Sequence, residues 1–293
     1  MVRRGTAFER FAFRASRKPA AAVDPGAMLQ PVLYDPIAAW ALLDDDDGEA
    51  PCLTTPAQRD RVSGAYPLTR TPGTVQATAD LIKGFRCAHG GSSARPLGRD
   101  DRNGGGVEPI FKLTGECTIS MRVWWSGSTA IGYPAVFDVS EGWSVRNAPN
   151  GGVQTFVRLY MISASGAIGG FHQRALGGYS YSDRGWTSSL TLTPGAWTYV
   201  ALRRSAAGAY TVTRNADHET GPALGDMPLP QYGQAAALNL GQWGSVQLSP
   251  SNMGWPGGDA WQGGFADVMV WDKRLTDAQI DNQRAVMFAL EAA

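Results

Sequence analysis

The stretch FDVSEGW at 137–143 brings two carboxylates, Asp138 and Glu141, close together in the chain. Two carboxylates act as acid and nucleophile in glycoside hydrolysis when they lie on one face, roughly 5 Å apart. Side chains three positions apart in an extended strand point to opposite faces of the sheet. This stretch therefore does not predict a catalytic pair.

Other catalytic patterns are equally weak. His89, His172 and His218 follow no metal-ligand spacing such as HxH or HExxH, and we expect surface or hydrogen-bonded histidines. No G-x-S-x-G nucleophile elbow occurs, and the Gly-rich DRNGGGVEP at 101–109 lacks the context of a phosphate loop. We expect that the chain is not an enzyme, has no catalytic residues and needs no cofactor.

Aromatic residues in Gly-rich stretches favour binding. SPSNMGWPGGDAWQGG at 249–264 and GGYSYSDRGWTSS at 177–189 are predicted loops, as is 163–170. Aromatic faces stack on sugar rings while Asp and Arg bond hydroxyl groups; the alternative is that the rings plug the ends of the core or contact neighbouring subunits. The candidate glycan-binding residues are Trp255, Trp261, Tyr179, Tyr181, Trp186 and Asp183.

The acidic run LDDDDGEA at 43–50 raises the question of a metal ion. Clustered carboxylates suit calcium, but consecutive Asp residues repel one another and usually mark a solvated turn. We assign no metal site and keep calcium as the alternative.

The first 18 residues are strongly basic, with six Arg and Lys against Glu9 alone, a net charge of +5. The whole chain is balanced, with 26 basic and 26 acidic residues, so nothing global indicates nucleic acid. Charges interrupt the apolar residues of this segment, which therefore does not resemble a secretory signal. The longest apolar run, IAAWALL at 37–43, is far shorter than the ~20 residues of a membrane span.

We interpret residues 1–32 as an extended basic arm that anchors the chain to another protein. Aromatic side chains would insert into that protein, and guanidinium groups would meet its carboxylates. The alternative is a tag-like arm. The candidate anchor residues are Arg3, Arg4, Phe8, Phe11, Phe13 and Arg14.

The elements that would carry these residues are mainly strands. TISMRV at 118–123 alternates as a strand with one wet face, and VQTFVRLYMI at 153–162 predicts a central strand. AWTYVALRR and AYTVTR, joined by SAAG, predict a hairpin over 196–214. The three cysteines, Cys52, Cys87 and Cys117, form no CxxC pair and are expected to be small core residues.

One helix is expected at the end of the chain, in RLTDAQIDNQRAVMFAL at 274–290. Thr276 is a candidate N-cap, Gln279 completes a capping box, and Leu275 and Ile280 occupy the hydrophobic-staple positions. The composition as a whole, with 36 Gly and 18 Pro, predicts antiparallel sheets packed face to face.

The order of segments over 33–293 resembles the concanavalin A-like lectin/glucanase superfamily, in its laminin-G-like branch. The segments are an opening strand AAWALLD, DLIKGFRCAHG (80–90), LTGECTISMRVWW (113–125), LTPGAWTYVALRRSAAGAYTVTRN (192–215) and GGFADVMVWDKRLTDAQI (263–280). The resemblance implies an all-β, antiparallel jelly-roll sandwich in which the last strand pairs near the first. Glycosidases of this superfamily carry an E-x-D-x-x-E run, and this sequence has none.

The resemblance leaves three function classes, because this fold carries hydrolases, lectins and structural modules. We favour a structural and adhesive component of a bacteriophage or phage-like virion, assembled in the host cytoplasm, whose head fibre, capsid or tail position stays open. It would be a homo-oligomer that contacts other virion proteins through its arm and binds cell-surface polysaccharide. The alternatives are a polysaccharide-degrading enzyme, a glycosidase or lyase, and a secreted bacterial adhesin.

Overall fold

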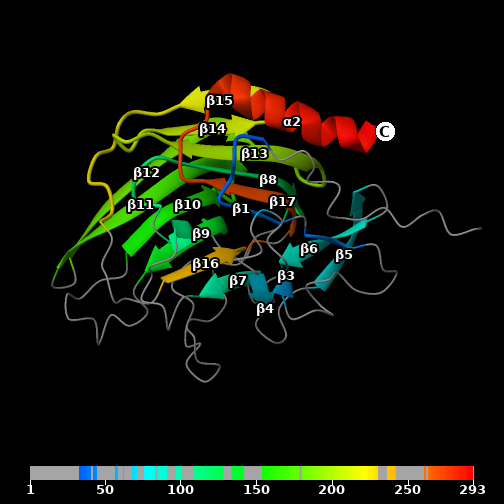
Figure 1. Ribbon diagram of the computed structural model, residues 1–293, viewed down its shortest axis with the longest axis horizontal. Helices are drawn as coiled ribbons and strands as arrows, with labels where there is room; N and C mark the ends of the chain where they lie inside the picture. The colour runs from blue at the N-terminus through cyan, green and yellow to red at the C-terminus, as the bar shows by residue number, and fades with distance from the viewer. Residues whose placement is uncertain are drawn as a thin grey trace, which may run out of the picture.

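Two antiparallel β-sheets packed face to face, with one helix on the outside, make up the described structure (Figure 1). The computed structural model describes residues 33–40, 42–44, 57–58, 62, 68–70, 76–82, 85–90, 97–100, 109–111, 113–127, 133–141, 154–177, 180–229, 236–241, 261 and 263–292. In the view of Figure 1, the helix lies at the top, above one sheet, and the other sheet lies below that sheet. The predicted all-β sandwich with a C-terminal helix is confirmed.

Sheet A is the sheet next to the helix. Its strands follow the order β15-β14-β13-β8-β17-β6-β2, while β1 pairs with β17 and β5 with β6. The bounds are β15 (Asp217–Thr220), β14 (Tyr210–Arg214), β13 (Trp197–Arg204), β8 (Cys117–Trp125), β17 (Gly263–Trp271), β6 (Phe85–Gly90), β2 (Leu43–Asp44), β1 (Ala38–Trp40) and β5 (Gln76–Ile82).

Sheet B has the order β12-β11-β10-β9-β16-β7-β4-β3. Its strands are β12 (Ser180–Thr191), β11 (Ala167–Gly177), β10 (Gln154–Met161), β9 (Ala135–Glu141), β16 (Ala236–Leu240), β7 (Leu97–Asp100), β4 (Leu68–Arg70) and β3 (Ala57–Gln58). A 3-10 helix, η2 (Pro109–Phe111), precedes β8. β10 lies between β9 and β11, so its predicted central position is confirmed.

Side chains from both sheets meet in one core. On β13, Val200 and Leu202 point into this core, whereas the alternate residues Tyr199 and Ala201 point to the other face of sheet A. Because successive side chains of a strand alternate between faces, the sequence pattern of this strand had predicted that division. β13 and β14 pair as the expected hairpin, with Leu202 opposite Val212.

The closing strand returns to the opening strand, as the resemblance implied. Ala38 lies opposite Val270 and Trp40 opposite Val268 in the antiparallel pair of β1 and β17. Trp40 and Val268 are both buried in the core between the sheets. The two ends of the sandwich segment are thus tied together by backbone hydrogen bonds and by apolar packing.

The helix α2 (Asp277–Ala292) begins at the predicted cap. The main-chain N–H of Thr276 donates to Oε1 of Gln279 (2.8 Å), and the N–H of Gln279 donates to Oγ1 of Thr276 (3.2 Å). Leu275 and Ile280 are buried together with Trp271 and Met287 in a second cluster on the outside of sheet A. The capping box is therefore confirmed, and both staple residues are buried.

The prediction of a wet face on β8 is wrong. Thr118, Ser120 and Arg122 are all buried, because α2 and the segment leading into it cover this face. Oγ1 of Thr118 donates to the carbonyl of Lys273 (2.8 Å) and accepts from the N–H of Leu275 (2.9 Å). Arg122 forms an ion pair with buried Asp267, which lies at a bulge of β17. The alternation of apolar and polar residues identified the two faces of β8, but it did not predict that α2 covers one of them.

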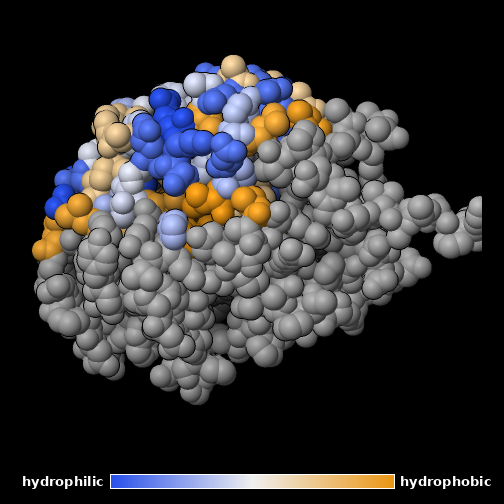
Figure 2. Space-filling view, in the orientation of Figure 1, coloured by the Kyte–Doolittle hydropathy of each residue, from blue (hydrophilic) through white to orange (hydrophobic). Residues whose placement is uncertain are grey.

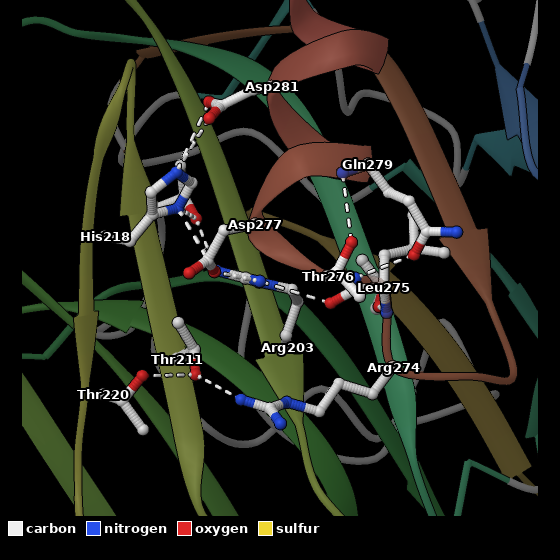
Figure 3. Close-up of polar contacts among 12 residues, drawn as sticks. Arg203, Thr211, His218, Thr220, Arg274, Leu275, Thr276, Asp277, Gln279 and Asp281 are labelled. Carbon is white, nitrogen blue, oxygen red and sulfur yellow. Dashed lines mark hydrogen bonds and ion pairs between the residues drawn. The ribbon is translucent and has the colours of Figure 1, made fainter.

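Polar contacts fix the start of α2 on sheet A (Figure 3). Buried Arg203 reaches Oδ1 of Asp277 (2.5 Å) and donates to the carbonyl of Leu275 (3.2 Å). His218 joins through Nδ1 to Oγ1 of Thr213 (2.8 Å) and through Nε2 to Asp281 (3.3 Å). Thr213 is fully buried, so this row of hydroxyl, imidazole and carboxylate has no accessible nucleophile. Its role is to hold the helix.

The predicted loop 177–189 is largely strand, whereas the predicted loop 163–170 is a turn at 163–166 followed by the start of β11. Residues 180–189 form part of β12, and β11 begins at Ala167. The residues of this stretch alternate along an edge strand, and Gly185 lies directly opposite Phe171 of β11. The third predicted loop, 249–264, ends within β17, and its residues 249–260 lie outside the described residues.

Several sequence predictions concern residues that the structure does not describe, among them Cys52, the acidic residues 45–50 and the arm at 1–32. Cys117 is a free, buried cysteine, as expected of a small core residue. Within the described ranges, no group of His, Cys, Asp and Glu side chains is arranged to hold a metal ion. No helix in those ranges has the length and apolar character needed to cross a membrane.

Candidate functional site

The candidate glycan-binding residues do not form one site among the described residues. Trp255 and Tyr179 lie outside the residues that the structure describes. The backbone of Tyr181 belongs to β12, where it lies opposite Ala175. The anchor candidates Arg3, Arg4, Phe8, Phe11, Phe13 and Arg14 also lie outside it.

Trp261 is a core residue. Its side chain is fully buried, and its ring lies 6.2 Å from that of Phe265, centroid to centroid. A buried ring has no face open to a sugar, so the candidate glycan contact at Trp261 is replaced by the alternative that the sequence left open, a plug within the sandwich.

Trp186 and Asp183 lie on opposite faces of β12, three positions apart. The half-buried indole of Trp186 packs against the core and directly on Gly221, where an added Cβ would lie 2.3 Å from Cδ2 of the indole. Asp183 is exposed, and its Oδ1 accepts a hydrogen bond from Nε2 of Gln173 (2.8 Å). Only Asp183 therefore points to the outer face of sheet B.

That outer face carries three cross-strand rows, which together we call the row face. In the middle row, Asp138 on β9 lies opposite Arg158 on β10, Arg158 opposite Phe171 on β11, and Phe171 opposite Gly185 on β12. Residues directly opposite each other in a sheet share a face. The flanking rows are Ser140–Thr155–Gln173–Asp183 and Tyr160–Gly169–Thr187.

A buried ion pair fixes the centre of the row face. Nε of Arg158 donates to Oδ1 of Asp138 (2.7 Å), and the carboxylate is fully buried. Oδ2 of Asp138 accepts from Oγ of Ser140 (2.6 Å), and NH2 of Arg158 donates to Oγ1 of Thr155 (3.2 Å). Charge-assisted hydrogen bonds of this kind hold a guanidinium plane in one orientation.

Aromatic rings surround this ion pair. The guanidinium carbon of Arg158 lies 4.9 Å from the centroid of the Phe171 ring, within the range of a cation–π contact. The Tyr160 hydroxyl bonds to Oγ1 of Thr187 (2.7 Å), and burial raises the pKa of Tyr160, so the phenol stays protonated. Tyr133 meets Tyr160 edge to face at 6.2 Å, and 65% of Tyr133 is exposed.

The row face therefore offers exposed and half-buried aromatic rings beside oriented hydroxyl, amide and carboxylate groups. Apolar ring faces and hydrogen-bonding groups side by side are the features that a sugar needs, since a pyranose has one apolar face and a rim of hydroxyls. Asp138 and Arg158, twenty positions apart, join only when β9 and β10 pair in this register. No local motif marks them, so the sequence prediction missed them.

One further polar side chain lies inside the sandwich rather than on a surface. His172 is buried, with Nδ1 bonded to the Tyr210 hydroxyl (2.9 Å) and Nε2 to the Gly225 carbonyl (2.9 Å). Burial lowers the pKa of His172 to about 4, so the ring is neutral at pH 7. His172 and His218 are both hydrogen-bonded, as expected of histidines without a metal-ligand spacing.

No protein-family model matches this chain, and no curated protein matches it. Solved structures are similar in fold. The match to the binding domain of botulinum neurotoxin serotype D covers 85% of this chain and 50% of the toxin chain, at 11% identity and a TM-score of 0.50. The match to a Trypanosoma rangeli sialidase, in complex with 2,3-difluoro-KDN, covers 84% of this chain and 32% of the sialidase chain, at 11% identity and a TM-score of 0.50.

A third similar structure is a heptameric SAP-like pentraxin from Limulus polyphemus, at 18% identity over 57% of this chain and 69% of its own, with a TM-score of 0.39. The chain spans half of the toxin binding domain and about a third of the sialidase chain. The two likenesses at a TM-score of 0.50 support a concanavalin A-like sandwich. The laminin-G-like branch and a virion origin stay predictions.

Proposed function

We propose that this protein is a non-catalytic glycan-binding head, and that the row face of sheet B is its binding surface. One observation carries the proposal: the row Asp138–Arg158–Phe171, in which a buried carboxylate orients a guanidinium against an aromatic ring. The Arg158 side chain is 11% exposed, so the row presents part of a fixed guanidinium beside an aromatic ring. Tyr133, with its exposed ring, adds a stacking face at the edge of the same surface.

The same geometry speaks against hydrolysis. Asp138 is held by Arg158 and Ser140, a setting that suits a positioning role rather than attack on a sugar. We expect no release of reducing ends when the protein is incubated with capsular and storage polysaccharides. A turnover signal that disappears on mutation of one Asp or Glu would overturn the non-catalytic part of the proposal.

Binding is tested with Tyr133→Ala. Removal of an exposed stacking ring costs on the order of 1 kcal/mol, so we expect about fivefold weaker retention in affinity electrophoresis on neutral polysaccharides. The matched control is Leu229→Ala, because Leu229 is similarly exposed, at 53%, and lies outside the row face. Both variants should melt within about 2 °C of the parent protein. Unchanged retention of Tyr133→Ala, or no retention of the parent protein, would contradict the proposal.

We propose further that the head belongs to a bacteriophage or phage-like virion, of the laminin-G-like branch, and is held there in several copies by residues 1–32. The support is the composition of this segment, whose Phe residues alternate with cations. Several copies raise weak attachment by ~10²–10⁴ through avidity. Deletion of residues 2–18 should leave the head folded and able to bind glycan but absent from purified particles. Normal incorporation would refute the anchoring role.

A further inference from the structure

Gly185 leaves a gap in the row face. It ends the middle row on β12, next to Phe171, and its position is exposed. Its neighbours on the same face of β12 are Asp183 and Thr187, each about 6.6 Å away along the strand. An ideal Cβ at Gly185 would lie 3.2 Å from Cδ2 of Phe171 and 3.9 Å from the Tyr160 hydroxyl oxygen.

The gap is bordered by chemically different groups. Phe171 supplies an aromatic edge, while the Tyr160 hydroxyl and Oγ1 of Thr187, bonded at 2.7 Å, lie on one side. The Asp183 carboxylate lies on the other side, where Gln173 holds it by a hydrogen bond of 2.8 Å. The missing side chain therefore exposes backbone between an aromatic edge, a pair of hydroxyl groups and a carboxylate.

The charge nearest the gap is the exposed Asp183 carboxylate. Glu219 lies farther along the same strand, where its Oε2 accepts from the N–H (2.8 Å) and hydroxyl (2.6 Å) of Ser189. Arg158 is paired with Asp138 and Arg184 with Asp226, while Arg174 belongs to the other face of β11, near Asp226. An acidic ligand here would meet like charge, whereas a hydroxyl group would donate to the Asp183 carboxylate.

From this placement we propose that the Gly185 gap is a subsite for one neutral sugar residue, with Asp183 as the acceptor for its hydroxyls and Gly185 as the residue that admits it. The inference rests on the proposed glycan-binding function and deepens it, because it assigns the ligand class: neutral rather than uronic or sialic acid-bearing polysaccharides. Phe171 and Tyr160 flank the ring, and Asp183 sets the preference against acidic ligands.

The experiment compares the intact protein with Gly185→Ala, Gly185→Gln and Asp183→Asn on three neutral probes, a mannan, a glucan and a galactan, and on acidic polygalacturonate. We expect the parent protein to retain at least one neutral probe and not polygalacturonate, with little dependence on salt. Gly185→Gln should lose more than tenfold in affinity and Gly185→Ala less. Asp183→Asn should lose about fivefold.

Two controls make the outcomes distinct. Gly115→Gln adds the same side chain at an exposed glycine whose added Cβ meets no atom within 4 Å, so it should leave binding and Tm unchanged. Asp183→Lys should acquire polygalacturonate binding that falls with salt. If the parent protein binds no probe, the glycan-binding proposal itself fails. If it binds and Gly185→Gln binds equally well, or if polygalacturonate binds best, the subsite is refuted while the binding function stands.

Discussion

Arg204 is a buried cation that holds the sandwich together at one end. It belongs to β13 of sheet A and is fully buried. Its guanidinium donates to the carbonyl of Gly115 from Nε (3.0 Å) and NH2 (2.8 Å), and also to the carbonyls of Leu113 and of Phe156 on β10 of sheet B. One side chain from sheet A thus satisfies three backbone acceptors, one on sheet B and two in the segment before β8.

Replacement of Arg204 by Met keeps the aliphatic volume and removes every one of these donors. Each buried acceptor left without a partner costs ~1–3 kcal/mol, and removal of a desolvated cation returns part of that cost. We expect a net loss of about 3–5 kcal/mol, a large fraction of the ~5–15 kcal/mol that stabilises a typical domain. For a domain of this size, the loss corresponds to a fall in Tm of roughly 6–20 °C.

The assay is urea denaturation followed by tryptophan fluorescence, with Tm from circular dichroism. The denaturation midpoint of Arg204→Met should fall while the m-value stays constant, because the surface exposed on unfolding does not change. Arg184→Met is the matched control: Arg184 is 38% exposed and paired with Asp226, so its replacement should cost less than about 1 kcal/mol. An Arg204→Met protein as stable as the parent would refute the reasoning, because the three carbonyls would then have other partners.

Three further outcomes follow from buried groups. Burial lowers the pKa of His172 to about 4, so between pH 6.5 and 4 the unfolded chain binds a proton at this histidine that the native state does not bind. The free energy of unfolding should therefore fall by up to about 3 kcal/mol as the pH falls through this window. His172→Gln should reduce this loss, as measured by urea denaturation at each pH. Burial raises the pKa of Asp267 to about 6 in spite of the attraction of Arg122, so between pH 6 and 4 the native state binds a proton that the unfolded chain does not bind. Asp267 therefore stabilises the protein as the pH falls, and Asp267→Asn should make the loss of stability between pH 6 and 4 steeper. If neither variant changes the slope of stability against pH, both predictions are wrong. Trp261→Ala should lower stability by about 3–5 kcal/mol in the same assay, whereas a surface ring would cost less than 1.

Local signals predicted the elements that depend on local physics. Thr276 and Gln279 are three positions apart and satisfy each other's N–H groups, so their bond needs no tertiary context. The β13–β14 hairpin likewise follows from a short connection, residues 205–209, between two apolar strands, and the N–H of Ser205 donates to the carbonyl of Ala209 (2.9 Å). These contacts span few residues, so composition and spacing were sufficient.

Glycine-rich aromatic stretches misled the prediction for a physical reason. In 177–189, Gly185 was taken as a sign of a loop, but it lies in the edge strand β12, opposite Phe171 of the neighbouring strand. For Trp261 the sequence left a sugar contact and a plug in the core both open, because its neighbours in sequence are small, and the structure buries it against Phe265. The size of the neighbouring residues in sequence does not determine which side chains pack against a residue in the folded protein.

The two outer faces of the sandwich show why the register of the strands decides where a ligand can bind. On sheet A, Tyr199 and Trp271 would form an exposed aromatic surface, but α2 covers them through Ile280 and Met287, and hydrophilic residues gather over this part of the molecule (Figure 2). On sheet B, the outward rows instead contain polar groups that pair across strands, Arg158 with Asp138 and Gln173 with Asp183. Such pairs keep their positions without a covering helix, because each side chain is held by its cross-strand neighbour. The part of this face over β9, with Asp138 and Ser140, is buried, whereas Gln173 is half-buried and Asp183, on the edge strand β12, is exposed. Toward β12 the face is therefore both exposed and fixed from within the sheet, and a site for a weakly bound sugar needs both properties.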